Sequence, residues 1–563
     1  MLRDFRTTRI GAAGWAIACA AALACGGGAS RPPADEGRRV LPPGASAPLF
    51  NDLGDHHRAV STRSELAQRY FDQGLVLTYG FNHAEAARSF REAQRLDPSC
   101  AMCFWGEAYA LGPNINKPMD PEDNPRAWQA SRAALAAAGG AAPVERALIE
   151  ALSARYAEQA PADRSGLDRA YADAMRPVAA AYPDDADVQA LFAEALMDTM
   201  PWNYYAPDGA EKPETREVVA TLERALALDP DHPGAIHFYI HAVEPSGAPE
   251  RAEAPADRLQ TLVPGAGHLV HMPAHIYLRV GRYHDASRAN ELAAAADETY
   301  ISQCRAQGFY PASYYPHNLD FLQASAGFEG RSAVALDAAR RLVGTLPPET
   351  VAEFPSTEEL LPRQLFALAR FGRWEEILAE PEPPAGLRYL TGMYRYARGV
   401  ALAATGRAGA ARAELEQVRA LGKELSRSDL TFLSGSSPAQ LLEIAALVLE
   451  ARIAGAGGDW AAAVAPLRTA VARQDALPYT EPPPWYFPVR EALGHALLQA
   501  GRAAEAEAVF AEQLERTPDN GWSLYGLAAS LRAQGKAEAA EAADARFREA
   551  FRRADVSLQA AVF

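Results

Sequence analysis

Histidines are the residues of this sequence best suited to chemistry, because seven of its 12 fall between residues 232 and 284. Two pairs have the spacing His-x-x-x-His, namely His237 with His241 and His271 with His275. On a helix, residues i and i+4 project from one face, so the two imidazoles of each pair can bind a single metal ion. The second pair follows the first by 34 positions, which indicates that both pairs occupy the same place in a repeated unit.

The 34-residue period recurs along the chain and predicts paired helices. Most units have a small residue at position 8, glycine near position 15 and alanine at position 20. A helical pair cannot bury its apolar face alone, so stacked pairs share one continuous core and leave a concave surface. Units that fit this register begin at Ala67, Pro233, Gly267, Pro316, Gly392, Phe487 and Gly521.

This register resembles that of the tetratricopeptide (TPR) superfamily over most of residues 60–555. The strings HPGAIHFYIHAVE, GHLVHMPAHIYLRVGRY, HNLDFL, CAMCFWGEA and PWYFPVREALG…DNGWSLYGL are similar to those of a group of exported bacterial TPR lipoproteins of unassigned function. The resemblance implies an all-α, right-handed α-solenoid that serves as a scaffold for a protein or peptide partner. Composition agrees, since no alternating Val/Ile/Thr pattern predicts strands. Pro-rich and aromatic-rich insertions, expected to fold as rims over the groove, interrupt the repeats at 112–125, 200–214, 300–315 and 477–486.

In TPR proteins, positions 2, 5 and 9 of the first helix of each unit face the concave groove. Asp320 occupies position 5 of its unit, and Glu244 follows His241 on the same helix face as a further ligand or general base. Copper and zinc are the ions that such ligands favour. Trp105 and Tyr109 are weaker groove candidates. The predicted metal ligands are therefore His237, His241, His268, His271, His275, His317 and Asp320.

Other interpretations of the histidines remain open at this stage. If a helix starts at Pro273, His271 lies near its first turn and the pairing with His275 is broken. The cluster could instead bind an anionic ligand or a peptide without metal, or serve only in packing. A metal-dependent hydrolase or oxidase using the same groove is a further alternative. No Ser-His-Asp order, His-Glu-x-x-His helix, P-loop or dinucleotide fingerprint assigns a reaction.

The N-terminus predicts export. Three arginines precede a short apolar run that ends in Ala22-Leu23-Ala24-Cys25, which resembles a bacterial lipobox with an acylated cysteine. Gly26 after Cys25 favours the outer membrane, facing the periplasm or the cell surface. The expected organisation is a signal peptide (1–25), a flexible tether (26–59), an N-terminal TPR array with the histidine-rich groove (60–350), a C-terminal TPR array (351–555) and a tail (556–563).

Charge and cysteine content restrict the partners and the compartment. The formal net charge of -16 argues against nucleic acid and against an anionic membrane surface, so membrane contact is expected only through the lipid. Cys100 and Cys103 are compatible with a disulfide, a metal-binding pair or buried thiols.

Overall fold

A computed structural model of the chain describes residues 39–40, 42, 44–45, 47–206, 209–304, 309–485 and 487–562. The predicted signal peptide and Cys25 lie outside these residues. The N-terminal part of the described chain contains two strands and eight α-helices. They are β1 (Arg39–Val40), β2 (Leu49–Phe50), α1 (Glu65–Tyr79), α2 (His83–Leu96), α3 (Ala101–Ala110), α4 (Asn124–Ala137), α5 (Pro143–Ser153), α6 (Ser165–Ala181), α7 (Ala186–Met197) and α8 (Pro213–Leu228).

The central part contains the helices that hold the histidines. They are α9 (Pro233–Val243), α10 (Glu253–Leu262), α11 (Gly267–His271), α12 (Pro273–Arg279), α13 (Tyr283–Cys304), α14 (Phe309–Phe328), α15 (Ser332–Gly344) and α16 (Pro348–Glu353). Single 3-10 turns η1 to η4 lie at Pro121–Asp123, Ala138–Gly140, Pro249–Ala252 and Pro355–Leu360.

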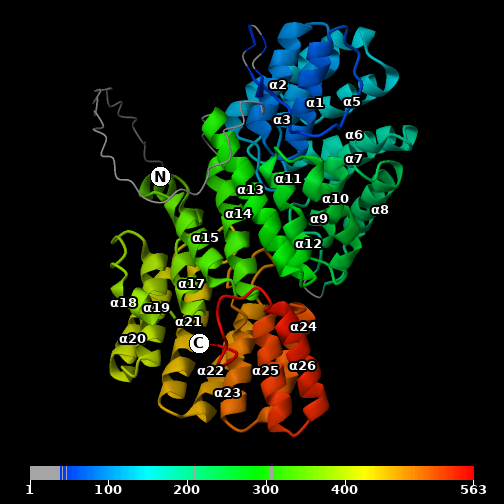
Figure 1. Cartoon of the computed structure of the whole chain (residues 1–563). Helices are drawn as coiled ribbons and strands as arrows, with labels where there is room; N and C mark the ends of the chain where they lie inside the picture. Colours follow the sequence, from blue (N-terminus) through cyan, green and yellow to red (C-terminus); the bar gives the residue numbers. More distant parts are fainter. Residues whose placement is uncertain are drawn as a thin grey trace, which may run out of the picture. The chain divides into compact units, whose positions relative to one another are not determined.

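The C-terminal part is again helical. It comprises α17 (Arg363–Arg370), α18 (Trp374–Ala379), α19 (Arg388–Ala404), α20 (Ala408–Leu425), α21 (Pro438–Ala456), α22 (Trp460–Asp475), α23 (Val489–Gln499), α24 (Ala503–Arg516), α25 (Gly521–Ala533) and α26 (Ala537–Ala550). Successive helices pack as neighbours along the chain (Figure 1). The fold is the predicted all-α solenoid of TPR-like helical pairs.

The repeat residues have the packing roles that the register assigns to them. A Cβ at Gly74 or Gly106 would come within 2.8 Å or 2.2 Å of the Phe90 ring, so only glycine lets α1 and α3 approach α2. Gly281 turns the chain between α12 and α13 with φ of +83°, in the left-handed region that glycine adopts freely. Small residues therefore set the helix spacing, as the repeat pattern predicts.

Two of the predicted boundaries are wrong. Pro316 does not begin a helix, because it lies inside α14, which starts at Phe309. The predicted insertion at 300–315 is accordingly helical wherever it is described, since α13 continues to Cys304. A proline inside a helix loses one backbone hydrogen bond and crowds the preceding turn, and here the helix continues through it because α14 packs along α13 and α15.

The predicted tether is wrong from residue 47 onward. Ala47 and Leu49 are buried, and the Tyr70 hydroxyl donates to the Ala47 carbonyl at 2.6 Å. β2 pairs with β1 in antiparallel register, with Arg39 opposite Phe50. The segment therefore packs on α1, because its apolar residues cover the end of the helical stack.

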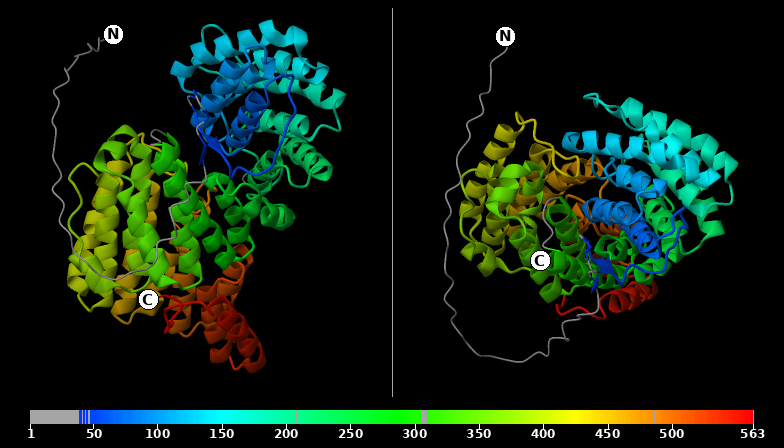
Figure 2. Two further views of the ribbon diagram at one scale, coloured as in Figure 1. Left: turned by 45° about the horizontal axis from the view of Figure 1, so that its top comes forward. Right: turned by 90° about the horizontal axis from the view of Figure 1, so that it is seen from above.

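The C-terminal repeats pack against the central repeats, which contain the histidines. The Trp522 indole on α25 donates to the Gly327 carbonyl of α14 at 2.9 Å. A Cβ at Gly281 would lie 2.4 Å from the Pro518 carbonyl oxygen. Figure 2 shows the red C-terminal helices beside the green central ones. Residues 39–563 form one compact unit, and the predicted division at residue 350 falls within α16 and stays a prediction. Among the described helices, none is both long enough and apolar enough to cross a lipid bilayer.

Candidate metal centre

Six of the predicted histidine ligands form two groups whose nitrogen atoms lie within 4.8 Å of one another. We call His237, His241 and His268 the first triad, and His271, His275 and His317 the second triad. They project from four helices of the central part, α9, α11, α12 and α14. Each of the two His-x-x-x-His pairs is therefore brought together as predicted, with a third imidazole from a helix further along the chain.

In the first triad, the hydrogen bonds of two imidazoles fix which nitrogen carries the proton. Nδ1 of His237 lies 2.6 Å from the Tyr79 carbonyl oxygen, which can only accept. Nδ1 of His241 lies 2.8 Å from Oε1 of Glu244. A neutral imidazole carries one proton, so both Nε2 atoms hold a lone pair. Both Nε2 atoms are buried and have no hydrogen-bond partner.

The second triad is ordered in the same way. Nδ1 of His271 lies 2.7 Å from Oδ1 of Asn290, whose amide nitrogen donates to Ala286 and thereby fixes the orientation of the amide. Nδ1 of His275 lies 2.6 Å from Oε2 of Glu244. With both protons on Nδ1, the two Nε2 lone pairs face each other at 2.9 Å. Two neutral imidazoles repel in that arrangement unless a proton or a metal ion lies between them.

Pro273 does not disrupt the second pair. α11 ends at His271 and α12 starts at Pro273, but Met272 between them keeps helical angles (φ -50°, ψ -37°). The Met272 N–H bonds to His268, and the His275 N–H bonds to the Met272 carbonyl. The turn therefore continues, and His271 and His275 remain on one face.

Burial keeps five of the six imidazoles uncharged. It lowers the pKa of His237, His268 and His271 well below the ordinary value, and neighbouring imidazoles lower it further. Burial likewise lowers the pKa of His241, and it lowers that of His317 to about 3. Neutral imidazole is the form that binds metal ions.

Glu244 joins the two triads rather than acting as a free ligand or base. Its two carboxylate oxygens accept from Nδ1 of His241 and of His275, one imidazole from each triad. Burial would raise the pKa of Glu244, but these two imidazoles lower it to about 2, so the carboxylate is ionised. Carboxylates that hold the outer nitrogen of a histidine are common behind metal ligands, because they orient the ring and increase its basicity.

Aromatic rings enclose the first triad, and two of them come from strained backbone. Phe81 and Trp202 have φ of 57° and 58°, unusual for residues with a side chain. The Phe81 ring centre lies 4.5 Å from that of His237, and the Trp202 ring centre lies 5.0 Å from that of His241. Such strain persists where surrounding contacts enforce it, often at functional sites.

The insertion at 477–486 reaches Glu244, the carboxylate between the two triads, as expected for a rim. The Tyr479 hydroxyl lies 3.4 Å from Oε2 of Glu244, and the Arg279 guanidinium lies 5.4 Å from the Tyr479 ring centre. Arg279 also approaches Glu481 to 4.0 Å. Sequence reasoning missed Tyr479, Arg279 and Glu481 because they occupy no repeat position that marks the groove. Tyr486 of this insertion lies outside the described residues.

Asp320 is not a metal ligand in this structure, contrary to the prediction. Its carboxylate forms a buried ion pair with Arg363, with 2.9 Å between Nε and Oδ1. Arg363 also donates to the Pro484 carbonyl at 3.0 Å. The repeat register placed Asp320 correctly on the helix face but did not reveal the arginine on α17 that neutralises it.

Trp105 and Tyr109 belong to neither triad. Both are buried within the core and stack on each other at 5.2 Å between ring centres. Burial raises the pKa of Tyr109 well above its ordinary value, and Glu194 raises it further. They are packing residues of α3 rather than groove contacts.

A third group is a hydrogen-bond network that supports the first triad. It consists of His56, Asp187 and His232. Nδ1 of His232 accepts from the Ala235 N–H, so its Nε2 carries the proton and donates to Asp187 at 3.1 Å. The Tyr79 hydroxyl donates to the same carboxylate at 2.7 Å. Nε2 of His56 lies 3.1 Å from the same carboxylate, and Arg58 donates to its other oxygen, so Asp187 is fully engaged. The network fixes Tyr79, whose carbonyl orients His237.

Asp297 gives this region a testable pH dependence. It accepts from Tyr310 (3.0 Å) and Asn318 (2.7 Å), and the Tyr310 hydroxyl in turn accepts from the His268 N–H. Burial raises the pKa of Asp297 to about 7. Because the folded pKa exceeds the unfolded one, the free energy of unfolding falls as pH rises from about 4 to about 7.

The variant Asp297→Asn removes this ionisation. Asn318 can turn its amide to accept from the new side chain, because its Oδ1 has no partner. We expect the variant to be more stable than the wild-type protein at pH 8, on the order of 2–4 kcal/mol, with little difference near pH 4. Denaturant unfolding at both pH values measures this difference, and an equal effect at both would contradict it.

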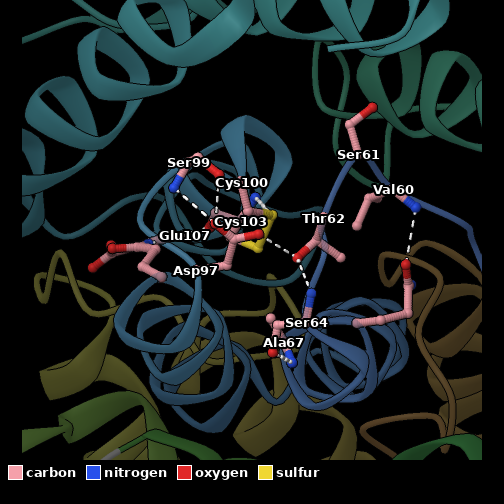
Figure 3. The surroundings of a disulfide bond; sticks show 12 residues. Val60, Ser61, Thr62, Ser64, Ala67, Asp97, Ser99, Cys100, Cys103 and Glu107 are labelled. Atoms are coloured by element: carbon pink, nitrogen blue, oxygen red, sulfur yellow. Dashed lines mark hydrogen bonds between the residues drawn. A yellow bond between two sulfur atoms is a disulfide. The ribbon is translucent and has the colours of Figure 1, made fainter. Parts of the chain in front are cut away.

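Cys100 and Cys103 form a disulfide at the start of α3, which decides between the three alternatives that the sequence allows. Figure 3 shows it beside the segment that precedes α1, where the Thr62 hydroxyl donates to Asp97. The Cys103 N–H also points to the Cys100 sulfur at 3.2 Å, so Cys100 caps the helix. The pair is therefore not free to bind metal in this structure.

Comparisons with known proteins add little to this geometry. No family model matches the sequence, and no curated protein matches it. Solved structures that resemble it include the human IFIT1 dimer with m7Gppp-AAAA (13% identity, 87% of this chain and 91% of that chain, TM-score 0.33). Yeast Tom70 (13% identity, 86% of this chain and 91% of that chain, TM-score 0.27) is another. At such values these similarities carry no inference about ligands or partners, and the fold assignment rests on the helical pairs themselves.

Proposed function

We propose that this protein binds transition-metal ions in a buried centre formed by the two triads. One observation carries the proposal: Nε2 of His271 and Nε2 of His275 face each other at 2.9 Å while both Nδ1 atoms bond to oxygen. A metal ion bound by both nitrogens replaces their repulsion with two coordinate bonds. In the first triad, the unpartnered Nε2 atoms of His237 and His241 offer the same donors.

The charge and burial of the site favour metal over the alternative of an anion or a peptide. Neutral imidazoles offer no positive charge to an anion, and burial lowers the pKa of five of the six. His237 and His271 have no exposed surface, and His275 is 2% exposed, so a peptide in a groove cannot touch them. The histidines that the register assigned to an open groove are buried in this structure.

Imidazole ligands suit copper and zinc, and the Irving–Williams order favours copper where both are available. Each triad supplies three protein ligands, which leaves a coordination position free on a four-coordinate ion. Closed structural sites use four protein ligands, whereas catalytic sites keep one position open. The geometry therefore supports a reactive centre more than a structural one, which keeps the metal-dependent enzyme as a candidate.

We further propose that the TPR-like repeats act as a scaffold for a protein or peptide partner and that the protein is exported. The Cys100–Cys103 disulfide supports export, because such bonds persist in oxidising compartments. Anchoring through Cys25 predicts that the wild-type protein sediments with membranes and that Cys25→Ala is released in soluble form. Release of both proteins alike into the soluble fraction would rule out the anchor.

Metal analysis of the purified mature protein tests metal binding. After exposure to copper or zinc and desalting, the wild-type protein should retain metal, and the control His57→Ala should retain as much, since His57 is exposed and pairs only with Asp72. A wild-type protein that retains no more metal than chemically denatured protein would reject the proposal.

A further inference from the structure

The two triads lie close enough to act as one centre. The ring centres of His241 and His275, which belong to different triads, are 5.4 Å apart. His268 and His271, also of different triads, are 5.7 Å apart on the same short helix. Glu244 holds one imidazole of each triad through its two oxygens. Ions in the two triads would therefore be neighbours, and one carboxylate would orient a ligand of each.

The charge around the triads favours monovalent ions. All six ligands are imidazoles, and Glu244 is the carboxylate that accepts hydrogen bonds from two of them. Asp320 is neutralised by Arg363, and Glu481 faces Arg279. Two divalent ions would bring four positive charges into a buried site with one uncompensated carboxylate, and burying unpaired charge is costly. Two copper(I) ions bring half that charge, and copper(I) accepts three nitrogen ligands readily.

The enclosure of the site limits what can react there. Phe321 lies 4.6 Å from His271 and 4.5 Å from His275 between ring centres, and Phe81 covers the first triad. A large substrate cannot reach ligand atoms that are buried this completely. A small, apolar molecule such as dioxygen can diffuse to them.

We infer that the two triads hold a pair of copper(I) ions that binds dioxygen between them, an inference that rests on the proposed metal binding. Each copper(I) loses one electron to become copper(II), and dioxygen gains both electrons to become peroxide. The π bond between the oxygen atoms is lost, their σ bond remains, and each oxygen forms a bond to copper. No proton is needed, and the total charge of the centre is unchanged. Return of both electrons releases dioxygen.

Oxygen uptake and electron paramagnetic resonance test this inference on the full mature protein. The protein is loaded with copper(I) without air, its copper content is measured, and air is then admitted. We expect two copper ions per chain, one dioxygen taken up for every two ions, and a weak paramagnetic signal, because the spins of two neighbouring copper(II) ions cancel. A full signal for two isolated copper(II) ions, no oxygen uptake, or one ion per chain would overturn the inference.

Matched variants separate this inference from the proposed function. His317→Ala and the bulkier His317→Gln each remove one ligand of the second triad, and circular dichroism verifies folding. With the first triad alone intact, stoichiometric oxygen uptake should disappear and oxidised copper should give the signal of an isolated ion. Unchanged uptake in both variants would contradict the inference, and His57→Ala should match the wild-type protein. If the wild-type protein binds no copper, the proposed function fails; if it binds two ions but no dioxygen, only this inference fails.

Discussion

Replacing His271 and His275 together by alanine is expected to remove one of two bound metal ions and leave the other. The pair supplies two of the three ligands of the second triad, so His317 alone remains there. The first triad keeps its oriented nitrogens, because Tyr79 and Glu244 still hold His237 and His241. Elemental analysis of the desalted proteins should therefore give half the wild-type metal content.

The complementary variant, His237→Ala with His241→Ala, should lose the ion of the first triad and also retain half the wild-type metal content. The four changes together should abolish metal binding. Glutamine at the same positions fills more of each cavity, and it serves if alanine prevents folding. Full metal content in both pair variants would show that the ions bind elsewhere. Complete loss in either pair variant would show that the two triads do not bind ions independently.

The second large effect is a loss of folding stability when the buried ion pair between Arg363 and Asp320 is broken. Replacing Arg363 by methionine leaves Asp320 buried without its partner, and breaking a buried ion pair in this way costs about 3–5 kcal/mol. The change also removes the bond that holds the Pro484 carbonyl, and with it one attachment of the rim insertion. Chemical denaturation should show a free energy of unfolding lower by that amount.

The double variant Arg363→Met with Asp320→Asn is the matched control, because it removes both charges. It should recover much of the lost stability, as uncharged replacements of buried ion pairs often do. Asp320→Asn alone should retain the wild-type metal content. A loss of metal in that variant would reinstate Asp320 as a ligand, and a change of less than about 1 kcal/mol in Arg363→Met would contradict the role of the pair.

The sequence predicted the fold well because the repeat is local. Glycine and alanine at fixed positions determine how closely neighbouring helices approach, as Gly74 and Gly106 do around Phe90. The same period predicted which histidines share a face. It could not predict helix extent around Pro316 or the packing of residues 47–59, because tertiary contacts decide both.

The site was predicted in part, for a physical reason. The histidine ligands follow the repeat, whereas the groups that orient or neutralise them come from elsewhere in the chain. Tyr79 lies 158 positions from His237, and Tyr479 lies 235 positions from Glu244. Arg363 likewise contacts Asp320 from another repeat, so the sequence pattern of a single repeat cannot predict this ion pair. The histidines are buried, so the open groove that the repeat predicts is an enclosed centre in the structure.

Anomalous X-ray diffraction from crystals of the mature protein loaded with copper tests the central claim most directly. At wavelengths on either side of the copper absorption edge, the account predicts two strong difference peaks per chain. One should lie at about 2.0 Å from Nε2 of His237 and His241, and the other at the same distance from Nε2 of His271 and His275. Crystals that show copper only at surface residues, or none, while these four imidazoles keep their positions would contradict the account.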